Sequence, residues 1–170
     1  REGAGACACS GLAHQALQPA RHRFGRRLRG ERLAGNFGEG GDATRSNAEH
    51  QRLMPLMHER KRNGFVRECH GDLHLGNLAW VNGQLLIFDC IEFSPSLRWI
   101  DVISEVAFCF MDLLHRQRRD LAFRFLNAWL EASGDYNGMV LLRYYAVYRA
   151  MVRAKVAALR AEQSDDSEAS

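Results

Sequence analysis

The first 49 residues show no regular alternation of apolar and polar positions. They are rich in glycine, alanine and arginine, and neither the period of a helix nor that of a strand recurs in them. The arginines between Arg21 and Arg32 would suit RNA or an anionic surface, but no Phe, Tyr or Trp beyond Phe24 is interleaved for base stacking. We predict that residues 1–49 form an irregular or disordered segment.

A regular pattern begins at about residue 50. Apolar residues from Leu53 to Met57 fall at helical spacing, and Pro55 suits a first turn, so we predict a helix that restarts there and ends at Arg62. Residues 65–69 then form a short extended stretch.

The clearest local signal is a pair of apolar runs on either side of Asn82-Gly83. This dipeptide favours a two-residue hairpin turn, because both turn positions need positive φ. The register pairs Val81 with Gln84, Leu78 with Ile87 and Asn77 with Phe88. Asn77 and Asp89 therefore lie at the same open end of the hairpin. Both faces of residues 85–88 are apolar, which predicts a buried hairpin.

Three amphipathic helices are predicted in the rest of the chain. Apolar residues recur at helical spacing over residues 99–114, 120–132 and 139–161. Residues 164–170 are acidic and are predicted to form a disordered tail. Between the irregular start and this tail, residues 50–163 are predicted to form one α+β domain, mostly helical with a small β-hairpin.

Composition and charge exclude several classes of protein. A net charge of +3 over 170 residues gives no strong field for nucleic acid. The chain contains no apolar run of about 18 residues and no signal-peptide pattern, so we predict a cytoplasmic protein without a membrane partner. The five cysteines form no C-x-x-C pair, and we expect reduced, buried thiols at Cys69, Cys90 and Cys109.

Candidate chemistry is concentrated in residues 70–77, His-Gly-Asp-Leu-His-Leu-Gly-Asn, and in Asp89 after the hairpin. The pattern His-x-Asp-x-x-x-x-Asn, followed by a second Asp, is that of the catalytic loop of protein kinases. Asp72 can accept a hydrogen bond from an attacking hydroxyl and take its proton. The Asn77 carbonyl and the Asp89 carboxylate are hard oxygen ligands of the kind that Mg²⁺ prefers.

Each of these residues also has an ordinary structural explanation. Asp72 and Asn77 are common turn residues, and only their combination with Asp89 around one hairpin favours catalysis. His70 and His74 lack the Glu of a helical H-E-x-x-H zinc motif, so hydrogen bonds to neighbouring backbone or carboxylate are expected. The remaining candidates have these assignments: helix cap or loop support for Asp101, solvated or capping roles for Glu92 and Glu105, and snorkelling beside the core for Arg149 and Arg153.

Two motifs, Glu68–Asn77 and Ile87–Phe93, resemble the aminoglycoside phosphotransferase family of kinase-like small-molecule kinases. The resemblance covers roughly residues 53–160. It is nearest to a bacterial subgroup in which such a domain often precedes a P-loop ATPase domain. It implies the C-terminal lobe of a protein-kinase-like fold with these roles: Asp72 as catalytic base, Asn77 and Asp89 on Mg²⁺, and His70 and Asp101 as loop support.

The same resemblance implies ATP as phosphate donor and a small-molecule hydroxyl as acceptor. Lys61 is the only lysine before the motif, and it falls on a predicted helix rather than a strand, so no nucleotide-binding residue is assigned. Only the C-terminal lobe is expected here. The implied function is a phosphotransferase-like fragment with negligible kinase activity alone, and the sequence does not decide whether the chain is an enzyme.

Two other functions fit part of the sequence. Gly71–His74 resembles the Gly-Asp-x-His element of metal-dependent phosphoesterases, although no Asp-x-His precedes it and no Gly-Asn-His follows. The second alternative is a non-catalytic helical interaction module. Neither the acceptor nor the oligomeric state is encoded in the motif, so aminoglycosides, sugars, choline-like alcohols and proteins all remain candidate acceptors.

Overall fold

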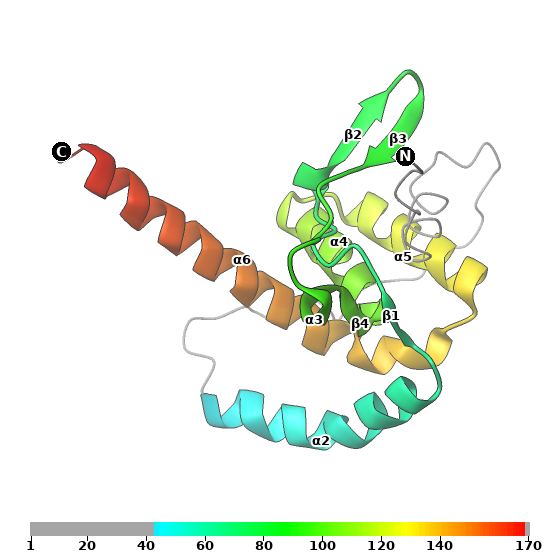
Figure 1. Ribbon diagram of the computed structural model, residues 1–170. Helices are drawn as coiled ribbons and strands as arrows, with labels where there is room; N and C mark the ends of the chain where they lie inside the picture. The colour runs from blue at the N-terminus through cyan, green and yellow to red at the C-terminus, as the bar shows by residue number, and fades with distance from the viewer. Residues whose placement is uncertain (1–42, 169–170) are drawn as a thin grey trace.

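The computed structural model describes residues 43–168, and the predicted arginine-rich and glycine-rich stretches lie outside this range. Helices and short strands are combined as predicted, in an α+β arrangement dominated by helix (Figure 1). The elements are α2 (Ala43–Arg62), β1 (Val66–Glu68), the 3-10 turn η1 (Leu75–Asn77), β2 (Leu78–Val81), β3 (Gln84–Ile87), α3 (Pro95–Arg98), β4 (Trp99–Asp101), α4 (Val102–His115), α5 (Arg119–Ser133), the 3-10 turn η2 (Tyr136–Gly138) and α6 (Met139–Glu168).

The strands β2 and β3 form the predicted hairpin. Leu78 pairs with Ile87 and Val81 with Gln84, and the turn residues Asn82 and Gly83 have φ of 49° and 78°. These pairs confirm the predicted register. Both turn residues take the positive φ that the Asn-Gly dipeptide favours.

The hairpin is not buried, which corrects the prediction from its apolar sequence. Leu85 is buried and Ile87 is partly buried on the same side of β3, but Leu86 and Phe88 on the other side are 45% and 48% exposed. A continuous apolar run does not reveal how many faces of a strand are covered. In Figure 1 the hairpin extends away from the helices. Leu78 and Ile87 of the hairpin pack against the core.

The helix predicted to begin at Trp99 begins at Val102. Residues 99–101 instead form β4, which pairs antiparallel with β1 over Val66–Glu68. Asp101 ends the strand and caps the helix, because its carboxylate accepts a hydrogen bond from the Ile103 N–H at 2.9 Å. The strand partner lies more than 30 residues away in sequence, so helical periodicity alone could not show this boundary.

The first and last helices of the described residues both extend beyond their predicted bounds. Helix α2 starts at Ala43 and continues through Pro55, because Leu53 and Arg60 are buried on either side of the proline and hold the helix in place. Helix α6 continues to Glu168, so residues 164–168 are helical rather than a disordered tail. Neither glycine nor proline interrupts it from Met139 onward.

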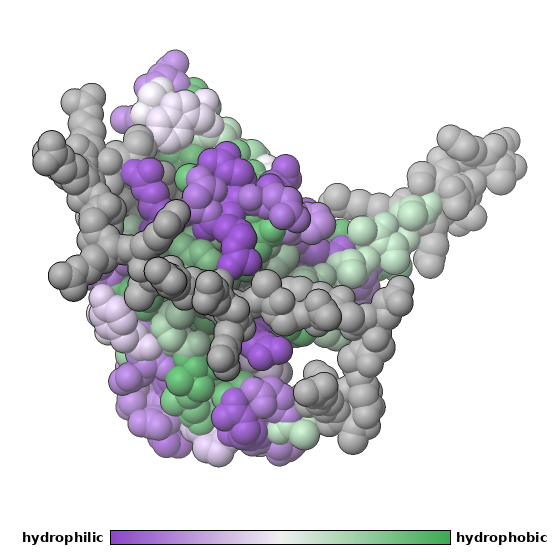
Figure 2. All heavy atoms as spheres, turned by 180° about the vertical axis from the view of Figure 1, so that it is seen from behind, coloured by the Kyte–Doolittle hydropathy of each residue, from purple (hydrophilic) through white to green (hydrophobic). Residues whose placement is uncertain are grey.

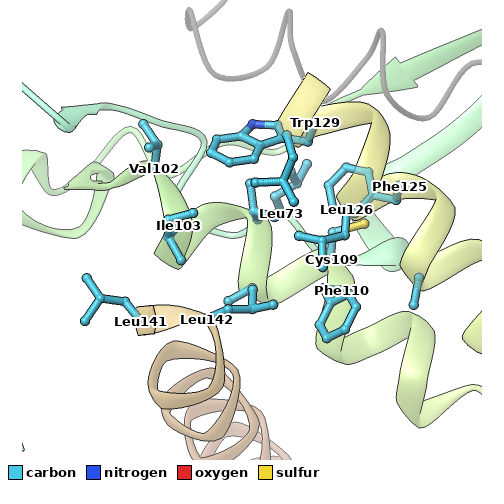
Figure 3. Packing of buried hydrophobic residues seen from close by; sticks show 14 of the residues in the cluster. Leu73, Val102, Ile103, Cys109, Phe110, Phe125, Leu126, Trp129, Leu141 and Leu142 are labelled. Carbon is cyan, nitrogen blue, oxygen red and sulfur yellow. The ribbon is translucent and has the colours of Figure 1, made fainter. Parts of the chain in front are cut away.

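Helix α4 forms the centre of the core. Every residue from Asp101 to Phe110 is buried, because α4 packs against both α5 and α6. Figure 3 shows apolar side chains from these helices meeting that of Leu73, which comes from the candidate loop. The labelled members of this cluster are Leu73, Val102, Ile103, Cys109, Phe110, Phe125, Leu126, Trp129, Leu141 and Leu142. Within residues 43–168, no helix has both the length and the apolar character needed to cross a bilayer.

Candidate functional site

The loop that joins β1 to β2 is anchored by an apolar side chain. Leu73 is fully buried in the core, whereas the neighbouring Asp72 side chain is 37% exposed. Burying Leu73 fixes the loop to the helices and leaves the carboxylate next to it open to solvent. This division of roles between adjacent residues suits a loop that presents a reactive group from a rigid base.

Asp72 and Asn77 are brought into direct contact. The Asn77 Nδ2 donates to the Asp72 backbone carbonyl at 3.0 Å and to the Asp72 carboxylate at 3.2 Å. Both contacts use the amide nitrogen, so the Asn77 Oδ1 keeps its lone pairs. Among the described residues, every fully buried polar side-chain atom has a hydrogen-bond partner. The Asn77 Oδ1 has no such partner, so it is not fully buried and reaches solvent.

Asp89 is held next to the loop through its neighbours in the chain. The Phe88 N–H donates to the Asn77 carbonyl at 3.1 Å, and the Ile91 N–H donates to the His70 carbonyl at 3.0 Å. Asp89 lies between these two bonds with φ of 62°. Its side chain is exposed and forms no hydrogen bond or ion pair with the residues described. The structure therefore brings the Asp89 backbone to the loop, and the carboxylate remains uncommitted.

His70 supports the loop with both ring nitrogens. Its Nε2 lies 2.8 Å from the Phe88 carbonyl, and its Nδ1 accepts from the Asp72 N–H at 3.3 Å. Both bonds are made together by the tautomer that carries its proton on Nε2. His74 contacts the Gly76 N–H at 3.0 Å and the Asp72 carboxylate at 3.4 Å. The prediction of hydrogen-bonded loop histidines is confirmed.

Sequence reasoning missed the acids that hold the loop backbone. Glu105 is 2% exposed and accepts the N–H groups of His70 and Gly71, at 2.9 and 3.1 Å, so the solvated or capping role predicted for it is wrong. Asp112 is 1% exposed and accepts the Leu75 N–H at 2.9 Å. The available signal was their position within an otherwise apolar helix, where an acid needs a buried partner.

Asp101 caps α4, one of the two roles predicted for it, and it also pairs with α2 rather than with the loop. Its carboxylate pairs with Arg60 of α2 at 2.7 and 2.9 Å, and Arg60 also pairs with Asp135 at 2.7 Å. Burial alone would lower the pKa of Arg60, but hydrogen bonds to Asp135 and Asp101 outweigh burial and raise it. The Asp101 carboxylate thus ties α2 to the start of α4, and its hydrogen bonds do not reach the loop.

The cysteines divide between core and surface. Cys69 and Cys109 are buried as predicted, and burial, followed by the charges of Asp112 and Glu105, raises the pKa of the Cys109 thiol to about 12. Cys90 is exposed, which corrects its assignment to the core. It lies shortly after β3 and follows Phe88 and Asp89, which are also exposed.

The oxygen atoms of this site fit a hard divalent cation that keeps part of its water shell. The Asn77 Oδ1 and the Asp89 carboxylate are both uncommitted, and Mg²⁺ is usually bound by one or two protein oxygens together with waters and phosphates. Residues 43–168 contain no group of three or more His, Cys, Asp or Glu residues arranged to hold a metal.

Comparisons with known proteins identify relatives but no activity. The chain is 38% identical over 108 residues to an uncharacterized protein of Mycobacterium tuberculosis and, to the same extent, to one of Mycobacterium bovis. These matches cover 64% of the chain, which spans only about a fifth (22%) of the length of these curated relatives. No family model and no solved structure matches the chain. The functional argument therefore depends on the site.

Proposed function

We propose that this domain supplies the catalytic-loop half of an ATP-dependent phosphotransferase that acts on a hydroxyl group of a small molecule. The observation that carries the proposal is the Asn77 amide, which donates to the Asp72 carboxylate and leaves its own oxygen free. This contact orients the Asp72 carboxylate, which suits a hydroxyl, and leaves the Asn77 Oδ1 available for a cation. The uncommitted Asp89 provides the second oxygen ligand.

In the proposed reaction, the acceptor oxygen attacks the γ-phosphorus of ATP. The bond from that phosphorus to the β–γ bridging oxygen breaks and ADP leaves, while the hydroxyl proton passes to the Asp72 carboxylate. The Asn77 amide donates to the Asp72 carboxylate, and the His74 ring lies 3.4 Å from it, so both restrict the Asp72 side chain. Its partial exposure lets an acceptor reach it, so alignment is the main contribution of this residue.

Mg²⁺ would be held by Asn77 and Asp89, and when bound it neutralises phosphate charge. The lysines of the described residues, Lys61 on α2 and Lys155 on α6, do not lie on strands, so we assign no nucleotide-binding residue. The proposal includes a cytoplasmic location, where ATP is present. Most of each relative lies outside the matched region, which leaves room there for a nucleotide-binding lobe and a P-loop ATPase domain. We therefore expect metal–nucleotide binding by this chain rather than turnover.

A titration with Mn²⁺ in place of Mg²⁺, followed by electron paramagnetic resonance with and without ATP, tests the proposal. We expect Mn²⁺–ATP to bind, and Asn77→Ala and Asp89→Ala each to weaken binding by about tenfold or more, because each removes a ligand oxygen. Asp72→Asn should retain binding, because Asp72 is assigned to the hydroxyl. Asp120→Ala, which removes an exposed carboxylate on α5, is the control. Equal affinity in the parent, Asn77→Ala and Asp89→Ala proteins would contradict the proposal.

A further inference from the structure

Two sets of opposite charges, each with an acid on α4 and an arginine on α6, lie beside the loop that carries Asp72. The first set is Glu105 and Arg149, which are 2% and 7% exposed. The second set is Asp112 and Arg153, whose side chains are 1% and 37% exposed and 2.7 Å apart. The acids are seven residues apart on α4 and the arginines four residues apart on α6, so each pair lies on one face of its helix.

The first set holds both polar backbone atoms of Gly71, the residue before Asp72. Its N–H donates to Glu105 at 3.1 Å, and its carbonyl accepts from Arg149 at 3.0 Å. Gly71 has φ of 84°, and a Cβ atom there would lie 2.9 Å from the Leu97 carbonyl oxygen, so a side chain at this position would clash with α3. The Gly71 N–H and carbonyl are therefore both held, and the peptide that leads into Asp72 is also held at its N–H, which donates to the His70 Nδ1 at 3.3 Å.

The second set holds the loop on the other side of Asp72. The Leu75 N–H donates to Asp112 at 2.9 Å, and Arg153 donates to the other oxygen of the same carboxylate at 2.7 Å. Leu75 begins the 3-10 turn that ends at Asn77. The two charge sets thus fix the backbone one residue before Asp72 and at the start of the turn that carries Asn77.

A role in stability alone does not account for this arrangement. Buried charges lose hydration, and well-packed apolar residues often stabilise a fold as well as a buried ion pair does. Burial lowers the pKa of Arg149, against the opposing effect of the Glu105 charge, so the guanidinium is held at an unfavourable place. Its donors are directed to two backbone carbonyls, those of Gly71 and Ser104. What these charges provide is a defined loop geometry.

We infer that Glu105, Asp112, Arg149 and Arg153 are positioning residues of the candidate site, an inference that rests on the proposed function. They touch neither substrate nor metal and act through the backbone of residues 70–75. Helix α6, far away in sequence, is accordingly part of the site. The inference extends the site beyond the loop and hairpin to two helical faces.

The test combines amide hydrogen exchange with the Mn²⁺–ATP titration for Arg149→Lys and Arg153→Lys. Lysine keeps the charge but cannot form the forked contacts of arginine. We expect faster exchange of the Gly71 amide in Arg149→Lys and of the Leu75 amide in Arg153→Lys. Mn²⁺–ATP affinity should fall about tenfold in each, as it does when the outer contacts of a metal site are lost. The thermal midpoint confirms that each variant is folded.

Arg143→Lys is the matched control, because Arg143 is an exposed arginine on the same helix. It should change neither exchange nor affinity. If the parent chain binds Mn²⁺–ATP and both lysine variants bind it equally well, the positioning role is wrong while the proposed function stands. If the parent chain does not bind Mn²⁺–ATP, the proposed function fails, and the positioning inference fails with it. Arg153 is partly exposed, so Arg153→Lys is expected to fold even if Arg149→Lys does not.

Discussion

Asp89 combines an exposed carboxylate with a left-handed backbone conformation, φ of 62°. For an L-residue this conformation costs roughly 1–2 kcal/mol, although Asp tolerates it better than most. The strain persists because Phe88 and Ile91, on either side, are hydrogen-bonded to Asn77 and His70. Strain maintained by the surroundings is typical of functional positions, and here it coincides with an uncommitted carboxylate.

A pair of substitutions at Asp89 measures this strain. We expect Asp89→Ala to be about 1 kcal/mol less stable toward unfolding than Asp89→Gly, because glycine takes positive φ without a Cβ clash. Urea denaturation of both variants gives the difference directly. Since the Asp89 side chain is exposed and has no partner among the described residues, lost contacts affect both variants equally. An alanine variant as stable as the glycine variant would show that the backbone relaxes.

The residues that could be predicted are those whose partners lie nearby in sequence. Asp72 and Asn77 are five residues apart, and the Asn-Gly turn fixes how Asn77 meets Phe88. By contrast, Glu105 lies 35 residues from His70, whose N–H donates a hydrogen bond to it. Such a partner is set by the packing of whole helices, and no local pattern encodes it.

At the level of elements, one buried arginine links helix α2 to two other parts of the fold. Arg60 is buried between Asp101, at the end of β4, and Asp135, which caps the turn η2. It also lies over the Phe65 ring, 4.2 Å from its centroid. Three elements that are distant in sequence thus meet at a single guanidinium.

Replacing this arginine tests its role. Arg60→Met should lower the free energy of unfolding by about 3–5 kcal/mol, because it leaves two buried carboxylates without their partner. Arg52→Met on the same helix is the control, since Arg52 pairs with Glu49 at the surface and should change stability by less than about 1 kcal/mol. Chemical denaturation measures both. Similar losses in the two variants would argue against a special role for the buried cluster.

Elements were predictable where a local signal marks them. Gly134 ends α5 in a left-handed conformation, φ of 69°, as its position after the apolar stripe predicts. The strand β4 and the exposed face of the hairpin were not predictable, because each depends on what lies beside the element. Sequence periodicity reports the intrinsic preference of a segment, and tertiary pairing decides the outcome.

At the scale of the whole molecule, one core links the site to the helices. Leu53 of α2 and Leu73 of the loop belong to the same buried cluster as the side chains of α4, α5 and α6. Outside this core, α6 extends from the body, and apolar residues are visible along that part (Figures 1 and 2). Met151 and Leu159 on α6 are 60% and 48% exposed. The described residues thus share one core and leave apolar surface uncovered on α6 and the hairpin.

This shared core leads to a prediction about unfolding. In a protein with Trp80→Phe and Trp99→Phe, the remaining tryptophan of the described residues is Trp129, which is 2% exposed in the core. We expect its fluorescence and the far-ultraviolet ellipticity of the helices to change at the same urea concentration, because α5 shares its core with α4 and α6. Trp80 and Trp99 are 55% and 52% exposed, so replacing them should leave the core intact. If the Trp129 signal were lost at a lower urea concentration than the ellipticity, α5 would unfold separately. In that case the loop anchored by Leu73 could open without unfolding the rest of the domain.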